Sequence, residues 1–269
     1  RTGCRRGLLD DSMNILLTND DGIHAEGLWA LYRQFEKSHS VVVVAPDRER
    51  SAVSHGITLH KPLRANRVQV NGYSGYAVNG TPADCIKLAV MEILKFKPDL
   101  VVAGINSGAN VGVNLNYSGT VSAAKEAALY GVPAIAVSLY GNSSRHFNEA
   151  AVFIRNLAEK VMENKLPFGT FLNVNIPNMA LDQTRGIRIS RQGIKLFSEY
   201  FDKRTDPRNR VYYWQSCQSG QNREDPDADS SVLCENYISI TPVKCDMTDY
   251  DFMESLKSWK IRLNGPEGV

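Results

Sequence analysis

The sequence predicts an α/β protein built on a doubly wound, mostly parallel sheet, followed by a β-rich segment. One observation is a set of short apolar runs, at 14–18, 40–45 and 99–104, that are rich in Val, Ile and Leu. Continuous runs of this kind are typical of strands buried on both faces of a parallel sheet. The second observation is that helical patterns separate these runs, which is the alternation of β-α-β units.

The helices and the remaining strands are predicted from local patterns. Apolar residues at spacings of three and four, from Leu28 to Phe35, predict the first helix. Thr81 as N-cap, Pro82 at the first helical position and Asp84 predict the start of the second, which continues to residue 94. The other predicted elements of this part are strands at 57–63 and 76–78, a helix at 121–130, a strand at 132–138, a helix at 147–162 and a strand at 171–176.

The pattern changes after residue 185. β-type residues occur at 186–201, 210–215 and 237–241, a polar loop is predicted at 218–231, and a short helix at 252–259. A β-rich excursion on a parallel-sheet core is typical of a subunit contact, so we expect this segment to form a subunit-contact arm.

Length and composition predict the domain organisation. We expect residues 1–12 to form a disordered leader, 13–185 the core, and 186–269 a β-rich arm with a C-terminal helix attached to the same domain. The sequence contains no apolar run of the roughly 18 to 20 residues that a membrane span needs. The formal net charge is +2 without a basic block, so we expect neither a membrane nor a stable nucleic-acid partner. Five scattered cysteines without a CxxC pair favour free thiols in a reducing cytoplasm.

Two adjacent carboxylates, Asp20 and Asp21, follow the first predicted strand. In open α/β sheets, ligands bind in the crevice beyond the carboxyl ends of the strands. Adjacent carboxylates repel each other unless a cation neutralises them, and their oxygen atoms suit hard ions such as Mg²⁺, Mn²⁺ or Ca²⁺. The alternative is that both residues only cap the following helix, whose N-terminus favours negative charge.

Two further loops are predicted at the same edge of the sheet. The loop after the second strand is long and polar and contains Ser51, and the loop after the strand at 99–104 begins near Asn106 and is dense in Gly, Asn and Ser. The Gly-rich loop lacks the spacing of a nucleoside-triphosphate or dinucleotide motif, and no HExxH pattern indicates a zinc hydrolase. The alternative for each loop is a solvated connection, but three strand ends would together supply hard oxygen donors.

Five ordered motifs resemble the SurE (survival protein E) family of metal-dependent nucleoside-monophosphate phosphatases. They are Asn14-Ile15-Leu16-Leu17-Thr18-Asn19-Asp20-Asp21-Gly22, Ala45-Pro46-Asp47-Arg48-Glu49-Arg50-Ser51, Gly80-Thr81-Pro82-Ala83-Asp84, Gly104-Ile105-Asn106-Ser107-Gly108-Ala109-Asn110, and Tyr117-Ser118-Gly119-Thr120-Val121. The resemblance covers residues 13 to about 138 and is looser in the C-terminal third.

The resemblance implies a Rossmann-like core, a C-terminal arm used to assemble a homodimer or homotetramer, a cytoplasmic location and a nucleotide substrate. It implies hydrolysis of nucleoside 5'- and 3'-monophosphates with one divalent metal ion per subunit, Mg²⁺ or Mn²⁺, which Ca²⁺ could replace in a crystal. The implied metal ligands are Asp20, Asp21, Ser51 and Asn106, and Asp20 and Asp21 are also the implied catalytic residues. The residues expected to bind phosphate or substrate are Asn19, Ser107, Gly108, Asn110, Ser118, Gly119 and Thr120.

The order of chemical steps stays open at this point. A metal-bound water could attack phosphorus, or Asp20 could act as a general base or attack directly to form an aspartyl-phosphate. The rival functions are a receiver-type module, which phosphorylation would control, and a nucleotide sensor without turnover. A receiver needs an aspartate at the end of a middle strand, where this chain has Gly104-Ile105-Asn106, so that alternative is disfavoured.

Overall fold

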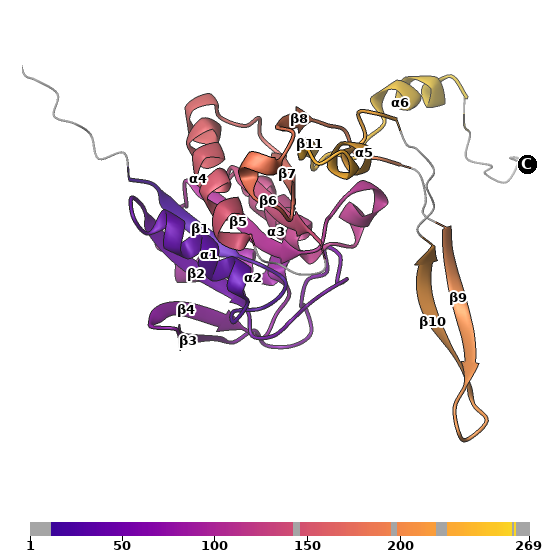
Figure 1. Ribbon diagram of the computed structural model, residues 1–269, viewed down its shortest axis with the longest axis horizontal. Helices are drawn as coiled ribbons and strands as arrows, with labels where there is room; N and C mark the ends of the chain where they lie inside the picture. The colour runs from indigo at the N-terminus through magenta and orange to yellow at the C-terminus, as the bar shows by residue number, and fades with distance from the viewer. Residues whose placement is uncertain (1–11, 142–145, 195–197, 219–224, 260, 262–269) are drawn as a thin grey trace, which may run out of the picture.

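The computed structural model describes residues 12–141, 146–194, 198–218, 225–259 and 261 (Figure 1). All but one residue of the expected leader at 1–12 lies outside these ranges. Among the described residues, no helix has both the length and the apolar character needed to span a bilayer.

The described part of the chain forms a nine-stranded sheet, in the order β3-β4-β2-β1-β5-β6-β7-β11-β8. Its parallel centre consists of β1 (Asn14–Thr18), β2 (Ser40–Pro46), β5 (Leu100–Ser107), β6 (Ala134–Tyr140) and β7 (Thr170–Pro177). β4 (Tyr73–Val78) extends it in parallel, and β3 (Ala65–Val70) closes that edge in antiparallel. The predicted doubly wound, mostly parallel sheet is confirmed.

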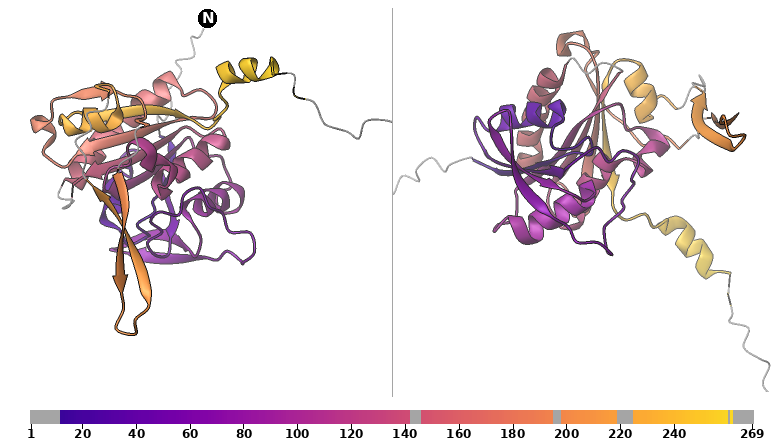
Figure 2. Two further views of the ribbon diagram at one scale, coloured as in Figure 1. Left: turned by 90° about the vertical axis from the view of Figure 1, so that its right-hand side faces the viewer. Right: turned by 90° about the horizontal axis from the view of Figure 1, so that it is seen from below.

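Helices cover both faces of this sheet (Figures 1 and 2). α1 (Glu26–Phe35) and α4 (Phe147–Asn164) pack together on one face, and α2 (Pro82–Leu88) and α3 (Gly119–Leu129) on the other. A separate buried apolar cluster lies under each pair. Because apolar helices cover both faces, the central strands are continuously buried, which explains their unbroken runs of apolar residues.

The start of α2 follows the sequence prediction. The Thr81 hydroxyl accepts a hydrogen bond from the backbone N–H of Asp84 (3.1 Å), and the Thr81 N–H donates to the Asp84 carboxylate (2.9 Å). The helix then continues as a π-helical turn, η1 (Ala89–Ile93).

Two predicted elements differ from the structure. Residues 57–63 form no strand, and the strand before β4 begins at Ala65. Ile57 and Leu59, the apolar residues at the start of that predicted strand, are 43% and 73% exposed, so neither side chain is packed into the core. The short helix α5 (Asp229–Cys234) was not predicted, because the preceding polar residues indicated a loop.

Two strands of the C-terminal third extend the sheet, and two others project from it. β11 (Ile238–Lys244) pairs antiparallel with β7, and β8 (Ile187–Ile189) pairs parallel with β11, so no break in the sheet marks residue 186. Between them in sequence, β9 (Ser198–Thr205) and β10 (Val211–Gln218) form an antiparallel hairpin that projects from the body, as α6 (Tyr250–Lys257) also does (Figures 1 and 2). We call β9–β10 the hairpin arm.

The order of strands creates a switch point next to β1. From β1 the chain moves outward to β2 and then to the edge hairpin of β3 and β4, and it returns to form β5 on the other side of β1 before moving on to β6 and β7. The connections after β1 and β5 therefore diverge, which opens a crevice at the carboxyl ends of these two strands. Asp20 and Asp21 follow one strand, and Asn106 belongs to the end of the other.

The long loop after β2 is held against neighbouring elements. The backbone N–H of Ser54 donates to the carbonyl of Tyr117 (3.0 Å). His55 Nε2 lies 2.7 Å from Glu126 Oε2 on α3, and Lys87 of α2 lies 3.3 Å from the other Glu126 oxygen. Burial alone would raise the pKa of Glu126, but the hydrogen bond from His55 and the charge of Lys87 outweigh it and lower this pKa. Residues around Ser51 are thus part of an ordered layer on α2 and α3.

Gly27 marks the closest approach of α1 to the sheet. A Cβ atom at this position would lie 2.2 Å from the carbonyl oxygen of Ile105. An alanine at an ordinary helix position stabilises by about 0.5–1 kcal/mol relative to glycine, but here the backbone of β5 would have to move. We expect Gly27→Ala to lower the free energy of unfolding by about 1–3 kcal/mol, measured by urea denaturation. Gln34→Ala in the same helix is the control, and an unchanged midpoint for Gly27→Ala would contradict the close packing.

Glu126→Gln tests the attachment of the loop after β2. The substitution removes the charge that faces His55 and Lys87, and we expect the free energy of unfolding at pH 7 to fall by about 1–2 kcal/mol. Because the folded-state pKa of Glu126 is lowered, the wild-type contribution is present above the usual pKa of 4.5 and is lost as the pH falls through the lowered value. The difference between wild type and variant should therefore shrink below about pH 4. A constant difference from pH 7 to pH 3 would refute the ionic contribution.

Candidate metal and phosphate site

Asp20 and Asp21 lie at the carboxyl end of the central strand β1. Asp20 is 5% exposed and Asp21 is half-buried. Neither caps the helix that follows, because the N-cap of α1 is Ala25 and no side chain bonds to that end. The alternative of simple helix capping is therefore wrong. Among the described residues, no Lys, Arg or His forms an ion pair with either carboxylate.

The side chain of Asp20 meets the first turn of α3. The Thr120 hydroxyl donates a short hydrogen bond to Asp20 Oδ1, and the backbone N–H groups of Gly119 and Thr120 also stabilise the carboxylate. A Cβ at Gly119 would lie 2.7 Å from the Asp20 Cβ, so only glycine permits this approach. Burial nevertheless dominates and raises the pKa of Asp20 above its ordinary value. The charged form needs a further positive partner.

Asp21 lies among other acidic groups. Burial, and then the charges of Asp20 and Glu49, raise the pKa of Asp21 to about 6, while a hydrogen bond from the backbone N–H of Ser107 opposes the rise. This bond also places the loop after β5 next to Asp21. Two adjacent carboxylates with a raised pKa, with the charge of Glu49 beside them, indicate a position that a cation would stabilise.

Ser51 lies in a loop that is bonded to the end of β1, next to Asp20. The backbone N–H of Arg50 donates to the carbonyl of Asp20 (2.7 Å), which brings the loop after β2 against the end of β1. The Ser51 hydroxyl donates to Glu49 Oε1 (2.6 Å). Because its hydrogen points at a carboxylate, the lone pairs of the Ser51 oxygen remain for a ligand.

Asn106 presents an oxygen atom for a similar reason. The register between β5 and β6 shifts between Ala103 and Asn106, and a β-bulge of this kind re-aims the side chains that follow it. The Asn106 amide nitrogen donates to the carbonyl of Gly108 (2.7 Å). With the nitrogen bound within the loop, the Oδ1 atom is the group that remains to accept a bond or to bind a cation.

Two of the residues expected to contact substrate, Asn19 and Asn110, have hydrogen-bond partners inside the protein. Asn19 is fully buried and bonds twice to Gly22, so it shapes the turn after β1. Asn110 is 8% exposed, its amide donates to Ser138, and its backbone carbonyl accepts from Asn173 and Asn175. Their described contacts thus hold the loops in place.

The other expected substrate residues lie at the ends of loops. Ser118 is the N-cap of α3, and its hydroxyl oxygen accepts from the backbone N–H of Val121 (3.1 Å). Ser107 is exposed at the end of β5, and Gly108 beside it is half-buried. Together with Gly119, these residues place two backbone turns near Asp20 and Asp21.

Two features of the site were missed from the sequence. Glu49 influences Asp21 and bonds to Ser51, and its position two residues before Ser51 in a polar loop was the available signal. Asn173 and Asn175, both fully buried on β7, hold Asn110 in place. Their signal was a pair of alternate asparagines inside an otherwise apolar strand, because a buried amide requires partners.

The donor set determines which ions the site would suit. Among the described residues, no group of three or more His, Cys, Asp and Glu side chains is arranged to hold a metal. A metal at Asp20 and Asp21 would therefore complete its coordination with neutral oxygen atoms such as those of Ser51 and Asn106. Oxygen donors of this kind fit Mg²⁺, Mn²⁺ or Ca²⁺ and do not favour zinc.

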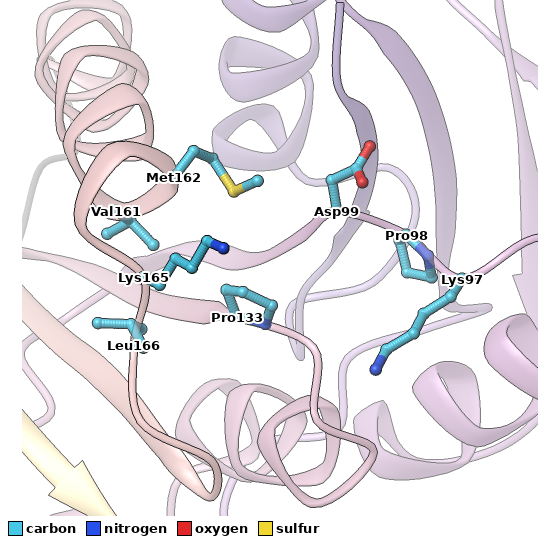
Figure 3. A pocket seen from close by; sticks show the side chains of 8 residues that line it. All are labelled: Lys97, Pro98, Asp99, Pro133, Val161, Met162, Lys165 and Leu166. Carbon is cyan, nitrogen blue, oxygen red and sulfur yellow. The ribbon is translucent and has the colours of Figure 1, made fainter.

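A separate cavity of about 380 Å³ lies at the opposite edge of the sheet (Figure 3). Asp99 and Pro133, which line it, precede β5 and β6, so it adjoins the amino ends of these strands. The Asp99 carboxylate accepts bonds from Asn14 (2.8 Å from the backbone nitrogen), and Lys97 and Lys165 also line the cavity. The one carboxylate that lines this cavity is already hydrogen-bonded, so the cavity lacks the adjacent acidic pair of the candidate metal site.

Comparisons with known proteins agree with this geometry. Two proteins named 5'-nucleotidase SurE are similar over 93% of this chain: one from Desulfatibacillum aliphaticivorans is 57% identical, over 99% of its own length, and one from Syntrophobacter fumaroxidans is 47% identical, over 100%. The crystal structure of the SurE protein from Aquifex aeolicus superimposes with a TM-score of 0.82 at 37% identity, covering 92% of this chain and 100% of that one. This match confirms the α/β, Rossmann-like fold. Residues 15–199 match the family model for survival protein SurE, and the chain belongs to the SurE family.

Proposed function

We propose that this protein is a metal-dependent phosphatase that hydrolyses nucleoside 5'- and 3'-monophosphates to nucleoside and phosphate. The observation that carries the proposal is the buried acidic pair at the switch point, which has no described cationic partner. Its membership of a family whose relatives are named 5'-nucleotidase supports the same activity. A receiver-type or sensing module is not favoured, because the similarity to nucleotidases extends over 250 residues.

Asp20, Asp21, Ser51 and Asn106 are the proposed ligands of one divalent ion, Mg²⁺ or Mn²⁺. The family resemblance implies a divalent metal, and the raised pKa values of both aspartates support a bound cation here. When bound, such an ion supplies Lewis-acid stabilisation to a phosphoryl oxygen and lowers the pKa of a bound water.

The chain's own groups orient the phosphate in this proposal. Ser107 and Ser118 border the acidic pair with hydroxyl groups, which suit the equatorial oxygens of a phosphoryl group, and Gly108 and Gly119 let the backbone approach closely. The N-terminus of α3 adds partial positive charge. Thr120, Asn19 and Asn110 act mainly by position: Thr120 orients Asp20, and the two asparagines shape the turns around it.

Asp20 has two roles that remain open within this proposal, as general base toward water or as nucleophile toward phosphorus. The Thr120 hydroxyl and the N–H groups at the start of α3 hold its carboxylate in one orientation, which serves either role. Acid quench during turnover of a ³²P-labelled nucleotide distinguishes them, because only direct attack leaves label on the protein.

A homodimer or homotetramer that uses the hairpin arm is also part of the proposal. Apolar and aromatic residues are exposed along the arm and on α6, where water would otherwise contact them. They are Tyr200, Phe201, Val211, Tyr212, Tyr213 and Trp214 on the arm, and Tyr250, Phe252, Met253 and Leu256 on α6. A cytoplasmic location, supported by the free thiols of Cys85, Cys234 and Cys245, belongs to the same proposal.

Release of inorganic phosphate from a panel of nucleotides is the deciding experiment. The panel contains 5'- and 3'-monophosphates of the common bases, with Mg²⁺, Mn²⁺ or EDTA. We expect release from monophosphates that requires the metal and stops in EDTA. Tight nucleotide binding without release would instead identify a sensor, and metal-independent release would contradict the proposed site.

Asp20→Asn and Asp21→Asn should each reduce phosphate release by at least about a thousandfold, because each removes a charge from the proposed metal site. Addition of Mn²⁺ at a hundred times its dissociation constant should stabilise the wild type by about 2.7 kcal/mol. We expect Asp21→Asn to lose most of this stabilisation, as measured by thermal unfolding.

Asp182→Asn is the matched control, since Asp182 is exposed in the short 3₁₀ turn η3 (Leu181–Gln183). It should leave both activity and the metal-dependent shift unchanged. An Asp20 or Asp21 variant that folds and turns over at near wild-type rate would refute the ligand assignment.

Light scattering after size exclusion tests the assembly. We expect a mass of two or four chains for the wild type, and a smaller assembly when Phe201 and Trp214 are both replaced by Ser, because the arm would lose apolar contact area. The exposed Phe168, remote from the arm in sequence, provides the control Phe168→Ser. A monomeric wild type would remove the proposed role of the arm.

A further inference from the structure

Both backbone polar groups of Gly112 are bonded to side chains. Its N–H donates to the carboxylate of Asp229, with distances of 3.1 and 2.9 Å to the two oxygens, and its carbonyl accepts from the side-chain amide of Gln192 (2.9 Å). Gly112 lies in the loop at 107–118, between the proposed metal ligand Asn106 and the N-cap Ser118. The contact therefore acts on the middle of the loop that borders the candidate site.

Asp229 is a fully buried carboxylate whose described partners are backbone groups. Besides Gly112, it accepts from the N–H groups of Gly193 (3.1 Å) and Ser230 (2.9 Å). A buried carboxylate is tolerated only when its oxygen atoms are hydrogen-bonded. Because these donors come from three separate segments, the carboxylate fixes the three segments relative to one another.

Two of those segments are the stems of the hairpin arm, at 191–193 before it and 225–230 after it. Arg191 and Ala228 form a parallel bridge. The N–H of Arg191 donates to the carbonyl of Asp227 (3.0 Å), and the N–H of Asp229 donates to the carbonyl of Arg191 (2.9 Å). The Arg191 guanidinium also pairs with Asp225 (2.7 Å). The stems are thus joined to each other and jointly hold Gly112.

We propose that Gln192 and Asp229 are positioning residues, through which the stems of the hairpin arm fix the loop at 107–118 for catalysis. The inference rests on the proposed function. Neighbouring Asn110 ties the start of this loop to β6 and β7, and the contact at Gly112 restrains the part that leads to Ser118. Contact of the arm with a second subunit would therefore affect the candidate site through the bonds of Gln192 and Asp229 to Gly112.

Gln192→Ala is the test, because Gln192 is half-buried on the surface and its loss leaves the buried Asp229 in place. One hydrogen bond contributes about 1 kcal/mol, which corresponds to about a fivefold effect. We expect kcat/KM for a nucleoside monophosphate to fall about fivefold and amide hydrogen exchange at 111–117 to become faster by a similar factor. The thermal midpoint should fall by only a few degrees, as expected for the loss of one hydrogen bond, and exchange in β1 should become faster by no more than the same factor.

Gln215→Ala on β10 is the matched control, with the same substitution on the arm itself, and should change neither quantity. Gln192→Met, which keeps the length of the side chain and removes the donor, should reproduce the effect and replaces the alanine variant if that fails to fold. Wild-type kcat/KM in a folded Gln192 variant would overturn the proposal, as would a loss of activity without faster exchange at 111–117. A wild-type chain inactive on every nucleotide would overturn the proposed function itself, and the positioning role with it.

Discussion

The structure at the carboxyl ends of the strands depends on the burial of two neighbouring carboxylates. Asp20 and Asp21 follow the central strand, and burial raises the pKa of both. Such a pair is unfavourable without compensation. Backbone N–H groups at the start of α3 and at Ser107 supply part of it. The remainder is the physical argument for a cation, and it explains why a glycine at position 119 must let α3 approach so closely.

The strands place the acidic pair, but loops supply most of the surrounding groups, and these loops are firmly attached. The segment with Ser51 is bonded to α3 through His55 and Glu126. The loop after β5 is bonded to β7 through Asn110 and Asn175. Residues far apart in sequence thereby share one rigid frame. Accurate positioning of this kind is what catalysis by orientation and electrostatics requires.

The sequence was most informative for the central strands, because a strand buried on both faces of the sheet requires an unbroken run of apolar residues. The central strands and α1 to α4 follow from apolar runs and capping residues, and the acidic pair from its place after β1. Local patterns were less informative for exposed segments. Residues 57–63 were predicted as a strand, but the apolar side chains of Ile57 and Leu59 do not pack on the core. The sequence predicted Asn110 and Thr120 as residues of the site but not their inward bonds, because hydrogen-bond partners more than sixty residues away have no local signature.

The path of the chain around the hairpin arm has a consequence for engineering. The chain leaves the sheet after β8 and comes back as β11, which lies beside β8, so the arm is an insertion between two adjacent strands. Its tip is a tight turn in which the N–H of Asn209 donates to the carbonyl of Asp206 (2.9 Å). A fluorophore or affinity tag placed at this tip would lie outside the nine-stranded sheet, so it would report on the surroundings of the arm in a living cell while the sheet stays intact.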